Sequence, residues 1–542
     1  MKKILCLLLL LQSSVLFAQN KYLVVFNDKA NSPYSIDQPQ EYLSQKAIDR
    51  RLKQGINITQ QDLPVNPAYI QALIAADIPV KFTSKWLNAA LVDIPESKLQ
   101  EVLALSFVKG LEGNYPTGLE NPSFRQKSEN SGSKNLGTTM TDPGSSLNQL
   151  AMLGADAMHA QGFTGKGVLI GLLDSGYLNA DELDVFEALF AENRVIETYN
   201  FVNTNESVYD AHSHGTSVLS CIASSLDGQL LGTAPDASFL LYVTENVNSE
   251  TKMEEANWLF AAERADSAGV DIVGSSLGYA DFQGTEQDYS YQDLDGNTAL
   301  ITRAADWLTA KGVVVVVSAG NEGNKAWKYI TAPADGDSVI AVGAVNSDQE
   351  YVSFSSVGPS SDAQIKPDVA AKGGSTTVAT PSNFVGMSNG TSFAAPLITG
   401  LVAGIREAFP DLTAMQIREI LLASGTQASQ PDNFLGYGIP NFERAHYLAS
   451  IKQLLNGNEK DILVFPNPSE STSKVKVLVA KEDYGTEFNV TLTNTLGVEV
   501  YQDSFRSKLF ELAITPNDLP AGLYILKVYN ENFSSTERIM MD

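Results

Sequence analysis

Four polar residues in this 542-residue chain stand at the ends of apolar stretches, and their types suit one kind of chemistry. Asp174 follows "VLIGLL", His214 begins "HGTSVLSCIA", Asn321 follows "VVVVVSAG" and Ser392 lies in "GTSFAAP". A serine hydroxyl becomes a nucleophile when an imidazole accepts its proton, and the imidazole needs a carboxylate on its other nitrogen. An amide side chain can stabilise the oxyanion that forms. The set therefore contains one candidate for each role in acyl transfer.

Each of these residues taken alone has a simpler structural interpretation. An Asp after a strand, or an Asn between glycines, is ordinarily a turn residue. Thr391 or Ser392 could cap the helix that begins there, in which Pro396 falls in the first turn. The conjunction of the four residues carries the acyl-transfer hypothesis, because the segment around Ser392 does not decide it by itself.

The elements that would position these residues alternate between strands and helices over residues 148–450. The apolar runs "VLIGLLDSG", "SFLLYVTE", "DIVGSSLG" and "GVVVVVSAGN" are typical of buried strands, and "TKMEEANWLFAAERADSAG" and "TALITRAADWLTAKG" have helical spacing. Buried strands joined by helices predict an α/β fold with a parallel sheet covered on both faces. Ligands of such sheets bind at the carboxyl ends of the strands, where Asp174 and Asn321 lie.

The segments around the four residues resemble the signature segments of subtilisin-like serine proteases. "DSG", "HGTSV", "SAGN" and "GTSFAAP" occur in that family's order of Asp, His, Asn and Ser. The resemblance implies a subtilisin-like fold over residues 148–450 and a serine-type endopeptidase of the EC 3.4.21 class. In that scheme Asp174 orients His214, His214 is the general base and later the acid, and Ser392 is the nucleophile. Asn321 and the Ser392 backbone N–H would stabilise the oxyanion.

The resemblance also implies which segments contact an extended protein or peptide substrate. The strand segment "SSLG" would pair with the substrate backbone, a form of β-augmentation. The segment "SAG" would line the pocket for the residue before the scissile bond. No cofactor is required for catalysis in this scheme, and structural calcium is compatible with it. The implied substrate-binding residues are Ser275, Ser276, Leu277, Gly278, Ser318, Ala319 and Gly320.

The N-terminal part of the chain reads as three segments. Residues 1–18 have two lysines, an apolar run and small residues up to Ala18, which predicts a secretory signal peptide. Residues 20–115 show a mixed α/β pattern without a cluster of catalytic residue types, and they resemble the inhibitory propeptide of subtilisin-like proteases. Residues 116–147 are rich in Ser, Gly, Asn, Pro and Thr, which predicts an exposed linker with the maturation site. The propeptide would act as an intramolecular inhibitor, so the enzyme would be made as a zymogen.

The C-terminal part, residues 457–542, has short alternating strands separated by turn residues. This pattern predicts a small all-β, sandwich-like domain. "VFPNPS" and "LPAGLYILKV" resemble the sorting domain of the type IX secretion system of Bacteroidetes. The alternative for this domain is a carbohydrate- or protein-binding module. The resemblance implies a secreted or cell-surface enzyme whose partners include the secretion machinery.

The composition limits the classes of molecule that this protein can bind. The chain has 63 acidic and 37 basic residues, a net charge of −26, which argues against nucleic acid and anionic membranes as partners. After the signal peptide, no apolar run is long enough to predict a membrane span. Cys6 leaves with that peptide, so Cys221 is the single remaining cysteine and no internal disulfide is expected. Its apolar surroundings predict that Cys221 is a core residue.

Other functions stay open at this point. "DAHSH" offers Asp210, His212 and His214 as ligands of a catalytic metal, which would make a metal-dependent hydrolase. A catalytically inactive subtilisin-like scaffold used for binding is a second alternative. An α/β-hydrolase esterase fits less well, because "GTSFA" lacks the second Gly of its motif and the residue order differs. "DLDGNT", residues 293–298, begins like a calcium loop but lacks the Gly and Glu that an EF-hand needs.

Overall fold

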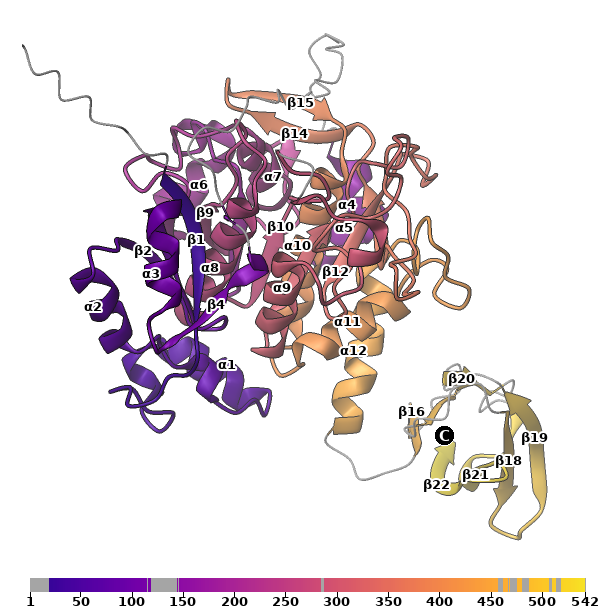
Figure 1. The fold of residues 1–542 in the computed structure, drawn as a ribbon. Coiled ribbons are helices and arrows are strands. Elements are labelled where there is room, and N and C mark those ends of the chain that lie inside the picture. The colour runs from indigo at the N-terminus through magenta and orange to yellow at the C-terminus, as the bar shows by residue number, and fades with distance from the viewer. Residues whose placement is uncertain are drawn as a thin grey trace, which may run out of the picture. The chain divides into compact units, whose positions relative to one another are not determined.

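The structure is a computed structural model of the chain, and it divides into two compact units, Met1–His446 and Tyr447–Asp542 (Figure 1). The predicted signal peptide and most of the predicted linker lie outside the described residues. None of the helices in the described part of the chain is long and apolar enough to cross a membrane. The structure describes residues 19–114, 116–117, 144, 146–283, 287–456, 462–465, 467, 475–479, 487–505, 509–512 and 518–541.

The larger unit is built on a 7-stranded sheet with the order β13-β12-β11-β10-β5-β9-β6, in which all neighbouring strands are parallel. Most of its strands are buried at every residue because helices cover both faces, which explains their continuous apolar runs. The α/β prediction is confirmed. The strands are β5 (Leu169–Asp174), β6 (Val195–Asn200), β9 (Ser238–Val243), β10 (Ile272–Ser275), β11 (Val314–Ser318), β12 (Ile340–Val345) and β13 (Val369–Lys372).

Two pairs of helices lie on opposite faces of this sheet. A Cβ built on Gly274 would meet Thr399 of α10 (Thr391–Ala408), whereas one built on Gly171 would meet Ala265 of α8 (Lys252–Ala268). α7 (His214–Ala223) packs beside α10, and α9 (Leu300–Ala310) packs beside α8. The other α-helices that follow residue 146 are α4 (Leu147–Leu153), α5 (Ala155–Ala160), α6 (Glu187–Ala191), α11 (Ala414–Ala423) and α12 (Phe442–Asn456).

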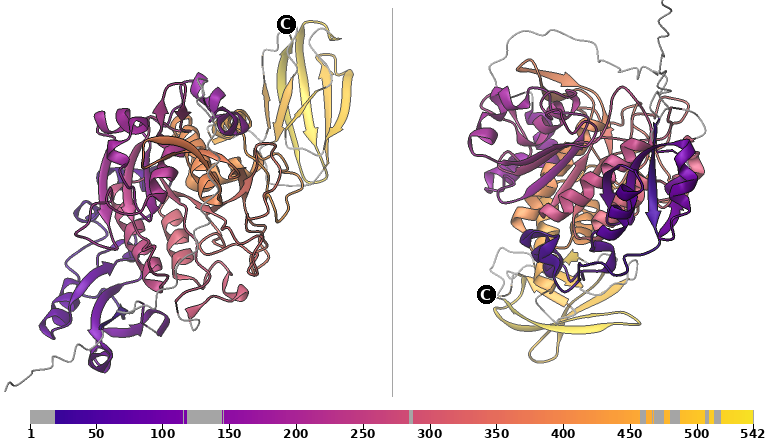
Figure 2. Two further views of the ribbon diagram at one scale, coloured as in Figure 1. Left: turned by 90° about the horizontal axis from the view of Figure 1, so that it is seen from above. Right: turned by 60° about the vertical axis from the view of Figure 1, so that its left-hand side comes forward.

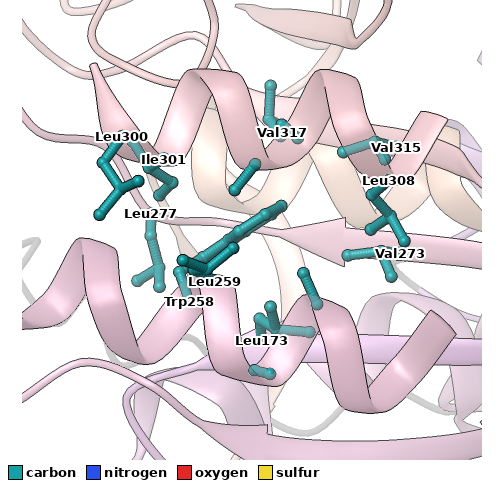
Figure 3. Close-up of a cluster of buried hydrophobic side chains, with 14 of the residues drawn as sticks. Leu173, Trp258, Leu259, Val273, Leu277, Leu300, Ile301, Leu308, Val315 and Val317 are labelled. Carbon is teal, nitrogen blue, oxygen red and sulfur yellow. The ribbon is translucent and has the colours of Figure 1, made fainter. Parts of the chain in front are cut away.

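The main hydrophobic core lies between the sheet and the pair α8 and α9. Trp258 and Leu259 of α8 meet Ile301 and Leu308 of α9 over alternate residues of the strands, such as Val315 (Figure 3). α8 begins at a capping box in which the Thr251 backbone N–H donates to Glu254 and ends at Gly269, whose φ is 93°. Two short antiparallel hairpins flank the sheet: β7 (Ser225–Leu226) with β8 (Leu230–Leu231), and β14 (Thr376–Thr380) with β15 (Phe384–Ser388).

The N-terminal part of the larger unit is a 4-stranded antiparallel sheet with the order β2-β3-β1-β4. Alternate residues of β1 point to opposite faces: Tyr22 and Val24 enter a separate N-terminal core, whereas Leu23 joins the main core. The N-terminal sheet is therefore packed directly on the rest of the larger unit (Figure 2). Its elements are β1 (Gln19–Phe26), α1 (Gln45–Lys53), α2 (Pro67–Ala75), β2 (Val80–Ser84), β3 (Ala89–Pro95), α3 (Leu99–Leu103) and β4 (Val108–Leu111).

After the end of α12, the described elements of the smaller unit are all strands, as predicted, and they form one sheet of order β16-β17-β20 and another of order β19-β18-β21-β22. Burial alternates along β21, because every second residue enters a core that includes Leu526 and Val528. The strands are β16 (Ile462–Phe465), β17 (Lys476–Val479), β18 (Phe488–Asn494), β19 (Glu499–Phe505), β20 (Leu509–Glu511), β21 (Gly522–Tyr529) and β22 (Ser534–Met541).

Candidate active site

Asp174 and His214 meet at the carboxyl end of the central sheet. Asp174 is the last residue of β5, and His214 is the first residue of α7. The His214 Nδ1 atom lies 2.8 Å from the Asp174 Oδ1 atom, and the two side chains are 26% and 1% exposed. A buried carboxylate thus faces one ring nitrogen of an imidazole whose ring is partly open to solvent.

The loops that carry these two residues approach closely because glycines stand at the crossing. A Cβ on Gly176, whose φ is 147°, would lie 2.2 Å from the His212 backbone nitrogen. A Cβ on Gly215 would lie 2.5 Å from the Gly176 carbonyl oxygen. No larger side chain fits at either position without moving backbone. The glycines of "DSG" and "HGTSV" therefore let the Asp and His segments pack against each other.

Ser392 is the second residue of α10 and is 8% exposed. Its hydroxyl donates to the Ser276 carbonyl oxygen at 3.3 Å, and the Ser276 hydroxyl donates back to the Ser392 carbonyl oxygen at 2.9 Å. The ring of the next residue, Phe393, has its centroid 5.7 Å from that of His214. The start of α10 therefore lies beside the imidazole, with its helix N-terminal N–H groups at the same place.

Asn321 follows β11 and is anchored by the start of α10. Its Oδ1 atom accepts hydrogen bonds from the Thr391 backbone N–H at 2.9 Å and from the Thr391 hydroxyl at 3.1 Å. Because Oδ1 is engaged, the amide N–H groups of Asn321 point away from Thr391 and can donate to another acceptor. Sequence reasoning missed this role of Thr391, although its place directly before Ser392 was a signal that could have shown it.

The predicted substrate-binding segments lie side by side. The Ser318 hydroxyl donates to the Leu277 carbonyl oxygen at 3.5 Å, and β10 and β11 pair in parallel directly before these segments. Thr331 lies against both: its Oγ1 atom would be 2.2 Å from a Cβ on Gly278 and 2.8 Å from a Cβ on Gly320. That Oγ1 atom is buried and has no hydrogen-bond partner among the described residues. Thr331 sits in an irregular segment, so no periodic pattern pointed to it.

The residues proposed as metal ligands do not converge. Asp210 is exposed, whereas the His212 Nδ1 atom lies 3.0 Å from the Ser175 hydroxyl oxygen. The part of the chain that the structure describes contains no group of three or more His, Cys, Asp or Glu side chains placed to hold a metal ion. Cys221 is buried in α7, where burial raises the pKa of its thiol. Tyr177 is buried and donates its hydroxyl to the Leu172 carbonyl oxygen at 2.7 Å.

A second set of polar contacts joins the N-terminal sheet to α8. Glu263 accepts hydrogen bonds from the Ser84 hydroxyl at 2.5 Å, from the Lys85 N–H at 2.8 Å and from the Trp86 N–H at 3.0 Å. Burial raises the pKa of the Glu263 carboxyl. All of these groups are buried, so the contact is a tightly fitted one.

Asp266, one turn further along α8, is surrounded by cations of the N-terminal part. Its carboxylate accepts from Arg50 at 2.6 Å, from Arg51 at 2.9 Å and from Lys85 at 3.2 Å. Burial by itself would raise the pKa of Asp266, but Lys85, Arg50 and Arg51 together hold it well below its usual value. We call Asp266 together with Arg50, Arg51 and Lys85 the Asp266 cluster.

Comparisons with known proteins match the three parts of the chain in which the sequence shows a family resemblance. Residues 165–438 match the model of the subtilase family, and residues 21–132 match the peptidase S8 propeptide domain of Bacteroidota. Residues 463–542 match the secretion system C-terminal sorting domain. The three family resemblances seen in the sequence are confirmed.

Two subtilisins agree with the family match. Subtilisin DY of Bacillus licheniformis is 35% identical over 300 residues, which are 55% of this chain and 97% of that protein. Subtilisin E of Bacillus subtilis (strain 168) is 33% identical over 301 residues, 55% of this chain and 70% of that protein. The crystal structure of MycP1 from Mycobacterium smegmatis has a TM-score of 0.45 and 23% identity, covering 55% of this chain and 84% of that one.

Proposed function

Since the chain belongs to the subtilase family and is a serine-type endopeptidase made as a zymogen, we propose that Asp174, His214 and Ser392 form its catalytic triad. The observation that carries this assignment is the 2.8 Å contact between Asp174 Oδ1 and His214 Nδ1. The carboxylate holds the imidazole in the tautomer with hydrogen on Nδ1, so the lone pair that accepts the Ser392 proton is the one on Nε2.

The reaction proceeds through an acyl-enzyme intermediate. Ser392 Oγ attacks the scissile carbonyl carbon while its proton passes to His214, and His214 then gives that proton to the leaving amine. Water, deprotonated by His214, releases the acyl group. The Asn321 amide and the Ser392 N–H donate to the oxyanion, and the fixing of Asn321 Oδ1 by Thr391 supports this role.

An extended substrate is held by the paired segments, with Ser275, Ser276, Leu277 and Gly278 on one side. Ser318, Ala319 and Gly320 line the pocket for the residue before the scissile bond. The contact of both segments with Thr331 supports a shared pocket. No cofactor takes part in this scheme, and calcium would act only on stability.

The N-terminal part, residues 20–115, is the intramolecular inhibitor, and the linker 116–147 contains the maturation site. The buried contacts of Glu263 and the Asp266 cluster support a part that stays docked until it is removed. Residues 1–18 act as the signal peptide. Residues 457–542 direct the enzyme, whose peptidase domain is 148–450, through the secretion machinery to the medium or the cell surface.

One experiment tests the catalytic assignment. The purified chain is incubated with casein, with and without a serine-directed sulfonyl fluoride, and with a chelator in parallel; mass spectrometry then locates the adduct. We expect cleavage to stop with an adduct on Ser392, and chelation to lower thermal stability only. Cleavage that resists the inhibitor but stops with the chelator would return the chemistry to Asp210, His212 and His214. A folded, processed chain that cleaves nothing would be a binding scaffold.

A further inference from the structure

His212 lies two residues before His214, and the Ser175 hydroxyl links its ring to the Asp174 carboxylate. Its Nδ1 atom is 3.0 Å from the Ser175 Oγ atom and 3.3 Å from the His214 backbone nitrogen. The Ser175 Oγ atom is in turn 3.2 Å from Asp174 Oδ1. His212 is therefore one hydroxyl away from Asp174 and in contact with the peptide N–H of the residue that begins α7.

The backbone holds His212 firmly in this position. Its carbonyl oxygen accepts the Leu178 N–H at 3.2 Å. Its backbone nitrogen and oxygen lie 2.2 Å and 2.5 Å from where a Cβ on Gly176 would be. The loops that carry Asp174 and His212 therefore pack closely against each other.

Donors converge on a single oxygen of Asp174. Oδ1 is approached by the Ser175 N–H at 2.7 Å, the His214 Nδ1 atom at 2.8 Å and the Ser175 hydroxyl at 3.2 Å. Oδ2 is buried and has no hydrogen-bond partner among the described residues. A carboxylate oxygen has two lone pairs, so three donors compete for two places. A group that turns the Ser175 hydroxyl away therefore leaves the two lone pairs of Oδ1 to the Ser175 N–H and to His214.

The hydrogens available at His212 and Ser175 allow two exclusive arrangements. When His212 Nδ1 is unprotonated, the Ser175 hydroxyl and the His214 N–H share its single lone pair as donors, and Asp174 Oδ1 keeps two donors. When Nδ1 carries a hydrogen, it donates to Ser175 Oγ, Ser175 donates to Asp174, and the His214 N–H loses this acceptor. The His214 N–H contact at 3.3 Å matches the first arrangement.

We propose that His212 is a positioning residue of the catalytic site, whose Nδ1 draws the Ser175 hydroxyl away from Asp174 and secures the N–H at the start of α7. The inference rests on the proposed function, because it assumes that Asp174 and His214 act as a pair. When the Ser175 hydroxyl no longer donates to Asp174 Oδ1, this oxygen accepts more strongly from His214 and stabilises the imidazolium better.

The test uses the activated full chain and a cycle of four forms: wild type, His212→Ala, Ser175→Ala and the double variant. We expect His212→Ala to lower kcat about tenfold with KM nearly unchanged, because Ser175 then turns to Asp174. The double variant should exceed His212→Ala in kcat by about threefold, because the competing hydroxyl is gone. His212→Asn, which can place an accepting oxygen near the Nδ1 position, should stay within about threefold of wild type.

Several results overturn the proposal. They are an unchanged kcat in His212→Ala, a double variant no faster than His212→Ala, or an Asn variant no better than the Ala variant. A purely structural role would lower kcat in the double variant further and would not produce this recovery. If His212→Ala does not fold, His212→Gln takes its place, because it keeps side-chain volume but displaces the acceptor by one methylene.

Active-site titration with a sulfonyl fluoride separates this proposal from the function on which it rests. Each rate is divided by the fraction of chain that forms the adduct, so incomplete maturation does not affect the comparison. Wild type labelled on Ser392, with variants that follow none of the expected pattern, overturns only the role of His212. Wild type that neither cleaves nor takes a label on Ser392 overturns the proposed function and this inference with it.

Discussion

Asp174 in the proposed catalytic site and Asp266 at the N-terminal interface are both buried carboxylates, but their hydrogen bonding differs. Asp174 has all its described donors on Oδ1, and Oδ2 has none among the described residues. Asp266 has donors on both oxygens, from Arg50 and Arg51 on Oδ1 and from Arg51 and Lys85 on Oδ2. Only the first carboxylate retains unused capacity to accept hydrogen bonds.

This difference corresponds to what each carboxylate has to do. A catalytic carboxylate must stabilise a charge that appears on the imidazole during the reaction, and the imidazole beside Asp174 is partly open to solvent. A docking carboxylate needs its compensation permanently, because a buried charge that loses its partner is strongly destabilising. We therefore expect the proposed catalytic site to depend on a carboxylate with incomplete hydrogen bonding, and the interface to depend on a carboxylate whose two oxygens both have partners.

Ser392→Ala should have the largest effect and should act on chemistry alone. We expect kcat to fall by at least about 10⁴-fold, because the nucleophile is lost. The Asp266 cluster should be untouched, so the N-terminal part should stay docked and, if maturation is autocatalytic, uncleaved. Peptide-hydrolysis rates and gel analysis of the purified chain measure both effects. The exposed Ser382→Ala is the matched control and should behave as wild type. A processed Ser392→Ala chain from a protease-free host would count against self-processing.

Asp266→Asn should act on docking alone. Removing the carboxylate leaves Arg50, Arg51 and Lys85 buried without their partner, which costs about 3–5 kcal/mol. We expect the N-terminal part in the Ser392→Ala background to open about 10²-fold or more often, measured as its digestion rate by an added protease.

The control for this change is Asp411→Asn, which alters an exposed carboxylate. Once the N-terminal part has been removed, Asp266→Asn in the otherwise wild-type chain should cleave peptides at the normal rate. Equal digestion of the Asp266→Asn and Asp411→Asn chains would show that complete pairing at the interface is not what holds it.

Replacing Asn321 by Leu should lower kcat by about 10²- to 10³-fold, with a small change in KM. The amide donates to an oxyanion that exists only in the transition state, so ground-state binding loses little. Thr391→Val removes the hydroxyl that fixes Asn321 Oδ1 but keeps the Thr391 N–H contact. Its effect should therefore be smaller. A larger loss in Thr391→Val than in Asn321→Leu would contradict the assignment of the donor.

Acidification to below the ordinary carboxyl pKa should loosen the interface, because Asp266 then loses its contribution to docking. Its pKa is held below the usual value, so its contribution is present above the ordinary carboxyl pKa, about 3.9, and is lost as pH falls below that value. Glu263 acts in the opposite sense, because burial raises its pKa and docking then favours its protonated form. Docking should therefore be tightest at mildly acidic pH. Digestion rates across pH measure this, and the acid limb should shrink in Asp266→Asn.

The contrast also explains what the sequence could reveal. The proposed catalytic segments are local: each of them places its polar residue at the junction of an apolar element with a short motif, so residue type and position could be recognised together. These residues are Asp174, His214, Asn321 and Ser392. The strand and helix periodicities similarly predicted the parallel sheet and the all-β unit. These signals depend on neighbours in the chain, and neighbours in the chain are visible without a structure.

The contacts that sequence reasoning missed join segments without any shared local pattern. Arg50 and Asp266 are 216 positions apart, and each looks like an ordinary charged residue of an amphipathic helix. His212 was considered only as a metal ligand, because its contact with Ser175 requires two loops to cross at Gly176. Thr331 has no periodicity around it. Such partners follow from the folded geometry, and the sequence alone does not specify them.

Thr331 allows the smallest and most specific test, because its hydroxyl, like Asp174 Oδ2, has no hydrogen-bond partner among the described residues. A buried hydroxyl without a partner is a cost that a polar substrate side chain could relieve. Thr331→Val keeps the shape and removes the hydroxyl, so it should lower kcat/KM about fivefold for a polar residue before the scissile bond relative to an apolar one of the same size. Thr331→Ser keeps the hydroxyl and should retain the ratio. Measured on paired peptides that differ only by Thr and Val at that position, an unchanged ratio in Thr331→Val would place the hydroxyl outside the substrate pocket.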